Sequence, residues 1–210
     1  MGYSSKNAEP TGECIFWGPS IMTGYYKNPE KTAEAFLGPP EDGWLRSGDV
    51  VKVFPNGSIK IIDRAKNIFK LSQGEYVAPE KVENILVQSP WLAQVWLHGD
   101  SLNNHCILIA VIDEIKFKSW AEANNKPLEQ SSLDDQGLRD EVYANIVSLC
   151  KSNKLNSLET PKQFQLLKDP FTIESDLLTP TMKLKRNIAR KMFADTIQKL
   201  YALPPLSAKK

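Results

Sequence analysis

The stretch that decides the fold reads IIDRAKNIFKLSQGEYVAPEKVE over residues 61–83. Its first two residues end the run Ser58–Ile62, which predicts a buried strand, and that strand is followed by the acid–base pair Asp63-Arg64. A polar loop that contains Gly74 comes next. Pro79 then stands at the start of a predicted helix, where its restricted φ angle and missing N–H are tolerated. The pattern predicts a junction at which a strand ends and a new, partly helical region begins.

The chain upstream of the junction is rich in strand and turn signals. The apolar segment Val50–Phe54 and the strand that ends at Ile62 flank the dipeptide Asn56-Gly57 and predict a β-hairpin. A short strand is expected over Gly12–Gly18, and a short helix is expected to begin at Pro29. This upstream region therefore holds many strands and little to close them.

From Asp63 onward, predicted helices and strands alternate. Helices and paired strands of this kind predict an α+β fold, with a small C-terminal domain made of a short antiparallel sheet and packed helices. A polar linker over Lys154–Pro161 is expected to be mobile. The expected helices cover Pro79–Gln88, Glu114–Ala123, Gln136–Lys151 and Asn187–Tyr201, and the expected strands cover Ala93–His98, Cys106–Ile112 and Phe164–Leu167.

Composition argues against several classes of function. The 210 residues carry a formal net charge of +1, which contradicts the basic surface that nucleic-acid binding requires. No run reaches the roughly 18 apolar residues that span a bilayer, and the start Met1–Tyr3 lacks the apolar core of a signal peptide. The widely spaced Cys14, Cys106 and Cys150 are interpreted as buried free thiols in a reducing compartment, not as a disulfide framework.

Two further motifs accompany the junction: GWLRSGD over residues 43–49 and TPTMKLKR over residues 179–186. In this order and at this spacing, the three motifs resemble those of the AMP-forming adenylating enzymes. The wording KNIFKLSQGEYV over residues 66–77 is similar to that of the eukaryotic long-chain fatty acyl-CoA synthetases. Adenylating domains of the luciferase-like or peptide-synthetase type, which are the alternative relatives, usually carry a shorter loop there.

The chain lacks one motif that the resemblance leads us to expect. Family members hold the ATP triphosphate on an upstream loop that is rich in Ser, Thr and Gly and ends in Lys, and no such loop occurs in this chain. The resemblance therefore implies the C-terminal part of a larger enzyme. It makes residues 1–62 the β-rich tail end of the large N-terminal AMP-binding domain and residues 63–210 the mobile C-terminal domain, with a hinge at residues 63–64.

Residues near the junction are expected to hold the nucleotide. Asp49 follows a glycine that lets the backbone turn sharply, and a carboxylate can accept hydrogen bonds from a ribose diol. The resemblance assigns Asp49 and Arg64 to the ribose of ATP or AMP, and makes Asp63 the hinge, which physically needs an exposed junction. The structural alternatives are a turn-capping aspartate and a surface Asp63–Arg64 pair worth at most about 1 kcal/mol.

The catalytic residue implied by the resemblance is Lys183, in a loop before the last helix, which meets the carboxylate oxygen and the α-phosphate during adenylation. Met182 precedes it, where the family more often has glycine. Gly74 is expected to line the tunnel for pantetheine, with Lys70 approaching the site in the rotated state; the alternative is that Gly74 only permits a turn. The nearby basic residues read as a solvated face, with coenzyme A phosphate binding as the alternative: Lys185, Arg186, Arg190 and Lys191.

The expected function is that of a long-chain fatty acid–CoA ligase, which forms an acyl-adenylate from fatty acid and ATP and then transfers the acyl group to coenzyme A. Mg²⁺ would accompany ATP, with ligands outside this chain. His98 and His105 lack the acidic or thiol cluster that a metal site needs. The isolated chain is expected to be inactive without its partner, the missing N-terminal domain. A non-catalytic binding module with the same fold is the alternative from another class. The expected location is intracellular, either cytoplasmic or peripheral to an organelle membrane through regions outside this chain.

Overall fold

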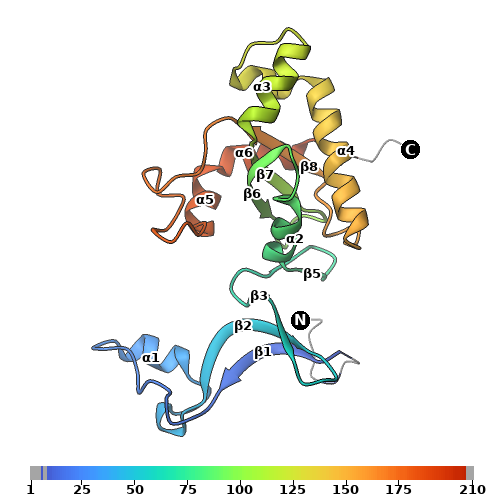
Figure 1. Ribbon diagram of the computed structural model, residues 1–210. Coiled ribbons are helices and arrows are strands. Elements are labelled where there is room, and N and C mark those ends of the chain that lie inside the picture. Colours follow the sequence, from blue (N-terminus) through green and yellow to red (C-terminus); the bar gives the residue numbers. More distant parts are fainter. Residues whose placement is uncertain (1–5, 7–8, 207–210) are drawn as a thin grey trace. The chain divides into compact units, whose positions relative to one another are not determined.

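The computed structural model describes Lys6 and residues 9–206. It divides into two compact units: the N-terminal unit ends at Ile68 and the C-terminal unit begins at Phe69 (Figure 1). The helices and small sheets of these units confirm the α+β class. The start Met1–Tyr3, which carries no signal-peptide core in the sequence, lies outside the described residues.

The N-terminal unit is built on a three-stranded antiparallel sheet. Its elements are β1 (Thr11–Phe16), α1 (Pro29–Ala35), the 3₁₀ helix η1 (Pro40–Asp42), β2 (Leu45–Val53) and β3 (Ile59–Arg64), with the sheet in the order β1-β2-β3. The predicted hairpin is confirmed as β2 and β3, and Gly57 adopts the positive φ of 80° at the turn between them. The short predicted helix is confirmed as α1, whose cap Asn28 accepts a hydrogen bond from the Lys31 amide at 3.0 Å.

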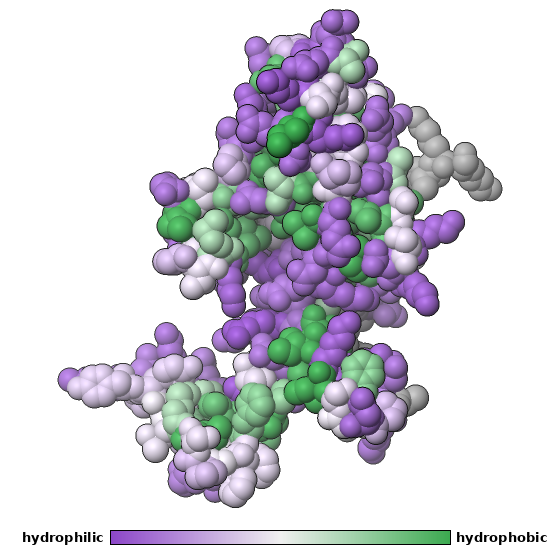
Figure 2. All heavy atoms as spheres, viewed as in Figure 1, coloured by the Kyte–Doolittle hydropathy of each residue, from purple (hydrophilic) through white to green (hydrophobic). Residues whose placement is uncertain are grey.

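Several large apolar side chains of the N-terminal unit are exposed. Trp17, Ile59 and Ile61 are 66%, 56% and 61% exposed, whereas Val50 and Val51 are buried. The prediction of a buried strand over Ser58–Ile62 is therefore wrong: the strand is present, but Ile59 and Ile61 are exposed in this unit. Apolar groups are correspondingly visible on the surface of this unit (Figure 2). Exposed apolar side chains that gather in so small a unit indicate a surface suited to covering by another part of a protein.

The C-terminal unit contains a two-stranded sheet, a three-stranded sheet and packed helices. Its elements are β4 (Phe69–Lys70), β5 (Tyr76–Val77), α2 (Pro79–Leu86), β6 (Leu92–His98), β7 (Ile107–Ile112), α3 (Glu114–Ala123), the 3₁₀ helix η2 (Gln130–Asp134), α4 (Gln136–Ser152), β8 (Gln163–Leu167), α5 (Arg186–Met192) and α6 (Ala194–Ala202). Every strand and helix predicted downstream of Asp63 is present, although the last helix is divided.

The β6-β7-β8 sheet separates two layers of the hydrophobic core. Every residue of β7 is buried, and successive residues pack on opposite faces of the sheet. Leu108 and Ile112 join the cluster formed with α2, α3 and α4, whereas Ile107 and Ile109 join the cluster formed with α5 and α6 (Figure 1). The unbroken apolar run of β7 therefore belongs to a strand that is covered on both faces.

Two details of this unit differ from the prediction. Strand β8 runs parallel to β7, so the sheet is mixed and not wholly antiparallel. The single helix predicted over Asn187–Tyr201 is broken at Phe193, where φ is −100° and ψ is 20°. The Phe193 ring packs against Trp96 and Phe171, at centroid distances of 6.0 and 6.1 Å. We attribute the break to this tertiary packing, because the local sequence carries no helix-breaking residue at that point.

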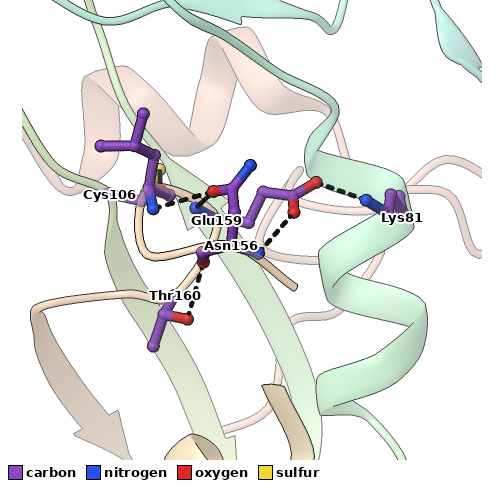
Figure 3. Close-up of polar contacts among 6 residues, drawn as sticks. Lys81, Cys106, Asn156, Glu159 and Thr160 are labelled. Atoms are coloured by element: carbon purple, nitrogen blue, oxygen red, sulfur yellow. Dashed lines mark hydrogen bonds and ion pairs between the residues drawn. The ribbon is translucent and has the colours of Figure 1, made fainter. Parts of the chain in front are cut away.

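The segment Lys154–Pro161, predicted to be a mobile linker, is held by hydrogen bonds. The side-chain oxygen of Asn156 accepts from the amides of Leu158 and Glu159, each at 2.9 Å. Glu159 is 8% exposed and pairs with Lys81 of α2 at 2.5 Å (Figure 3). The composition of the segment was misleading because its polar side chains bond to local backbone groups instead of to water.

Candidate functional site

The N-terminal unit brings the two predicted ribose contacts together. Asp49 of β2 and Arg64 of β3 are direct partners across the sheet. The Arg64 Nε lies 3.1 Å from the Asp49 Oδ1, and the two side chains are 60% and 26% exposed. An ion pair this exposed contributes at most about 1 kcal/mol. Its polar atoms can therefore exchange this contact for a ligand at little cost.

The backbone around Asp49 differs from the tight turn that the sequence predicts. Asp49 lies inside β2, at a register shift between β2 and β3 that follows at Val50. Gly48 has a φ of +72°, and its carbonyl accepts a hydrogen bond from the Ala65 amide at 2.8 Å. The Asp49 amide donates to the Ser47 hydroxyl at 3.0 Å. Glycine is required here by a kinked strand, and the Asp49 carboxylate faces Arg64 instead of capping a turn.

Asp63, expected at an exposed junction, is only 1% exposed. Its Oδ1 accepts hydrogen bonds from the Arg64 amide at 2.6 Å and from the Asn67 side-chain amide at 3.3 Å. Asp63 pairs with the buried Val50 across the sheet, which explains its burial. The residue secures the end of β3, and its assignment as a hinge stays a prediction.

The C-terminal unit places Gly74 and Lys70 in one hairpin, formed by β4 and β5. Gly74 has a φ of +95°, and a Cβ added to it would lie 3.8 Å from Lys70 Cε. The Lys70 ammonium lies 5.8 Å from the centroid of the Tyr76 ring, on the strand opposite. The backbone at Gly74 requires glycine by itself, so the turn reading of this residue has a physical basis independent of any tunnel.

The Gly74 hairpin is docked on a neighbouring turn of the same unit. The Ser72 amide donates to the Asn103 carbonyl at 3.0 Å, and the Gln73 side chain donates to the Asn104 carbonyl at 3.1 Å. This turn lies between the predicted strands Ala93–His98 and Cys106–Ile112, and the sequence contains no signal that the hairpin rests on it. These contacts fix the position of the hairpin on the C-terminal unit.

Lys183 lies in a closed loop before α5, as the sequence predicts. The Thr179 amide donates to the Lys183 carbonyl at 2.8 Å, and the Lys183 amide donates to the Thr179 hydroxyl at 3.0 Å. Met182 has a φ of +60° and a side chain that is 65% exposed. A left-handed backbone of this kind is strained for a residue with a side chain and would suit glycine better.

The Lys183 side chain is exposed, and within Lys6 and residues 9–206 its ammonium has no hydrogen-bond or ion-pair partner. The neighbouring basic residues Lys185 and Arg186 do form ion pairs. Lys185 Nζ lies 2.5 Å from Asp176 Oδ1, and Arg186 forms two hydrogen bonds with Glu83 of α2, at 2.8 and 2.5 Å. The predicted solvated basic face is therefore partly an ion-paired one. The unpaired cation of Lys183 is available to a ligand.

Two buried histidines of the C-terminal unit lie beside Tyr201 of α6. The Tyr201 ring is 6.2 Å from the His98 ring and 5.3 Å from the His105 ring, measured between centroids. Burial, with Arg190 as the second cause, lowers the pKa of His98 to about 4. Burial also lowers the pKa of His105 and raises the pKa of the Cys106 thiol to about 12. These neutral groups belong to the core, and Cys106 and Cys150 are buried as predicted, while Cys14 is only half-buried.

The chain is similar over nearly its whole length to long-chain acyl-CoA synthetases. It is 42% identical over 205 residues to the peroxisomal long chain acyl-CoA synthetase 7 of Arabidopsis thaliana, which covers 96% of this chain and 29% of that protein. It is 43% identical over 196 residues to long-chain-fatty-acid–CoA ligase 1 of Homo sapiens, which covers 93% of this chain and 28% of that protein. The chain thus spans less than a third of the length of these relatives. No family model matches the chain.

Solved structures of adenylation domains are similar to this chain in fold. The adenylation domain of a carboxylate reductase from Mycobacterium chelonae superposes with a TM-score of 0.84 at 30% identity, covering 97% of this chain and 30% of that one. The A-PCP didomain of the carboxylic acid reductase from Segniliparus rugosus, in complex with AMP, superposes with a TM-score of 0.83 at 31% identity, covering 96% of this chain and 26% of that one. By sequence and by fold, the chain belongs to the AMP-forming acyl-CoA synthetase superfamily, in which it matches a part of the long-chain fatty acyl-CoA synthetases.

Proposed function

We propose that the chain is the C-terminal part of a long-chain fatty acid–CoA ligase. The main support is the exposed ammonium of Lys183, which has no partner within the described residues and sits on a loop held in a defined shape. Similarity to long-chain acyl-CoA synthetases over nearly the whole chain supports the choice of a fatty acid as the substrate.

The reaction has two steps. In the first, a carboxylate oxygen of the fatty acid attacks the α-phosphate of ATP, and pyrophosphate leaves. Lys183 acts here as a preorganised cation that stabilises the negative charge developing on the phosphoryl oxygens. In the second step, the thiolate of coenzyme A attacks the acyl carbonyl carbon, and AMP leaves. Asp49 and Arg64 hold the ribose hydroxyl groups in both steps, because their polar atoms lie side by side and remain accessible.

The second step uses the Gly74 hairpin. Gly74 has no side chain, so the hairpin presents a bare backbone to a thin ligand such as the pantetheine arm of coenzyme A. Lys70 lies beside it and approaches the same ligand. Asp63 serves as the hinge about which the C-terminal unit turns between the two steps. The location of Asp63 five residues before the boundary at Ile68 supports this assignment, whereas its burial does not meet the expectation of an exposed junction.

ATP and coenzyme A are the cosubstrates, and Mg²⁺ accompanies ATP. Mg²⁺ is usually held by one or two carboxylates together with substrate phosphates. The described residues contain no group of three or more His, Cys, Asp or Glu side chains suited to a metal ion, and we assign no Mg²⁺ ligand to them.

The partner of the chain is an upstream AMP-binding domain. The exposed apolar residues of the N-terminal unit support this partner, because such a domain would cover them: Phe16, Trp17, Trp44, Ile59 and Ile61. No helix within the described residues is long and apolar enough to cross a membrane. Two similar Arabidopsis proteins are named peroxisomal, and we place the enzyme inside the cell, in the cytoplasm or at the periphery of an organelle membrane.

The test is a comparison of the chain with an enzyme in which the chain is joined to its upstream domain. The joined enzyme is expected to release pyrophosphate when palmitate and ATP are added and to form palmitoyl-CoA when coenzyme A follows. The isolated chain is expected to do neither. Pyrophosphate release without any transfer to coenzyme A would contradict the ligase assignment, and saturable turnover by the isolated chain would contradict the need for the partner.

A further inference from the structure

A single carboxylate of α2 joins three elements of the C-terminal unit. Glu83 Oε1 accepts hydrogen bonds from the Leu97 amide of β6 at 2.8 Å and from Arg186 Nη1 at 2.8 Å. Its Oε2 accepts from Arg186 Nη2 at 2.5 Å. The two side chains are 12% and 20% exposed. A bidentate contact of this kind, largely removed from water, fixes orientation as well as distance.

Glu83 and Arg186 lie close in sequence to the two segments that carry the proposed chemistry, the Gly74 hairpin and the Lys183 loop. Arg186 is the first residue of α5 and lies three positions after Lys183. Glu83 lies on α2, which begins five positions after Gly74. Helix α2 is itself fixed, because Val82 and Leu86 are fully buried in the core. Arg186 therefore attaches the C-terminal end of the Lys183 loop to a helix that is packed into the core.

Apolar burial and an exposed ion pair also hold the Lys183 loop, but neither is a buried polar contact at its C-terminal end. Leu177 and Leu178 are buried at its start. The Lys185–Asp176 pair joins the loop to a preceding turn and is 35% and 63% exposed, so it is a weak restraint. The Glu83–Arg186 pair is the well-buried polar contact at the end of the loop.

We propose that Glu83 is a positioning residue for Lys183: through Arg186 it holds the Lys183 loop in the geometry that adenylation needs. This inference rests on the proposed function of Lys183. It also gives the C-terminal unit a mechanical property. Because Glu83 links α2 and α5, the Gly74 hairpin and the Lys183 loop move as one body when the unit turns between the two steps.

The same helix supplies a matched control. Lys81 lies two positions before Glu83 and pairs with Glu159 at 2.5 Å (Figure 3). The Lys81 side chain is 44% exposed and that of Glu159 is 11% exposed. This pair ties α2 to the segment around Asn156 instead of to the Lys183 loop. Replacing Lys81 by Met breaks an ion pair of α2 and leaves the Arg186 contact in place.

The first measurement is hydrogen exchange on the 210-residue chain. Glu83→Gln keeps the size of the side chain and an oxygen for the Leu97 amide, but it removes the charge that holds Arg186. Exchange of the loop amides of Thr179, Lys183 and Lys185 is expected to speed up about tenfold, because the loop opens locally more often. Lys81→Met is expected to leave these amides close to their original rates.

The second measurement is made in the enzyme joined to its upstream domain. Glu83→Gln is expected to lower the kcat of adenylation by on the order of 10–100-fold, since a displacement of about 1 Å has that scale of effect. The KM for ATP should change little. Transfer of the acyl group to coenzyme A from supplied acyl-adenylate should stay close to normal. Arg186→Lys should retain more adenylation than Arg186→Met, because it keeps a cation for Glu83.

The two measurements separate the inference from the proposed function. Unchanged exchange in Glu83→Gln, or an equal change in Lys81→Met, would overturn the positioning role whatever the activity. An equal loss in both half-reactions would also overturn it, because that is the signature of general destabilisation. A joined enzyme that does not adenylate even without a substitution contradicts the proposed function, and the exchange experiment still decides whether Glu83 holds the loop.

Discussion

Replacing Lys183 by Ala is the most direct test of the proposed chemistry. The Lys183 side chain is exposed and has no partner within the described residues, while both polar groups of its backbone bond to Thr179. These backbone bonds do not depend on the side chain. The free energy of unfolding should therefore change by less than about 0.5 kcal/mol, as for other surface substitutions. The adenylation rate should fall on the order of 10²–10³-fold, which is the scale for one preorganised electrostatic contact.

The matched control is Lys185→Ala, two positions away. Lys185 pairs with Asp176 in an exposed contact, so its loss should cost at most about 1 kcal/mol of stability and leave adenylation close to normal. The assay is fatty-acid-dependent pyrophosphate release by the joined enzyme, followed by thioester formation from supplied acyl-adenylate. Lys183→Ala should be defective in the first assay and close to normal in the second. Equal loss in both assays, or the same defect in Lys185→Ala, would refute the assignment.

Substitutions at three further positions test the remaining features. At Gly74 the φ of +95° strains any L residue, and an added Cβ would contact only Lys70 Cε, at 3.8 Å. Gly74→Ala should therefore slow transfer of the acyl group to coenzyme A moderately, and Gly74→Leu should block it. Adenylation should stay close to normal in both variants. If rapid-quench measurements show equal transfer rates for the two variants, the tunnel role is wrong. Met182→Gly should stabilise the chain to urea by up to about 1 kcal/mol by relieving the left-handed strain, whereas Met182→Ala should not, and no difference between them would refute the strain. The pKa of His98 is about 4 in the folded chain, below its unfolded value of about 6.5, so the unfolded chain binds a proton first as the pH falls. The free energy of unfolding therefore decreases between about pH 6.5 and about pH 4, and the loss is about 2 kcal/mol at pH 5. Urea unfolding at pH 7.5 and pH 5 should show that His98→Phe loses less stability on acidification than the unmodified chain, and parallel losses would contradict the burial of a neutral imidazole.

Local patterns predicted most of the elements because each element depends on its own residues. The Asn56-Gly57 turn specifies the hairpin, and the boundaries of α3 agree with the predicted Glu114–Ala123. Distant contacts account for the errors. The helix break at Phe193 depends on packing against Trp96, and the parallel placement of β8 depends on the crossover through α3 and α4 that connects it to β7.

The candidate site likewise combines features that local sequence predicts with features that depend on distant contacts. A resemblance in short motifs made Asp49, Arg64, Gly74 and Lys183 the candidate site residues, and of these four Gly74 has a local physical reason for its identity, its positive φ angle. The burial of Asp63 was not predicted, because it depends on the register that pairs Asp63 with Val50. In this case the strand pairing decides which side of the sheet a charged residue faces.

The class of the fold, the order of its elements and the residues that carry charge or need glycine can be predicted from the sequence. These properties follow from periodicity, turn chemistry and short motifs, which are local. Only the tertiary structure decided which charges remain available. Charge alone does not separate Lys183 from Lys185 and Arg186, and the sequence analysis singled out Lys183 only through a resemblance. In the folded chain Lys185 pairs with Asp176 and Arg186 pairs with Glu83, whereas the Lys183 ammonium has no partner among the described residues. The physical reason is that an ion pair requires two groups within a few ångströms, and residues separated by 103 positions meet only when the chain has folded.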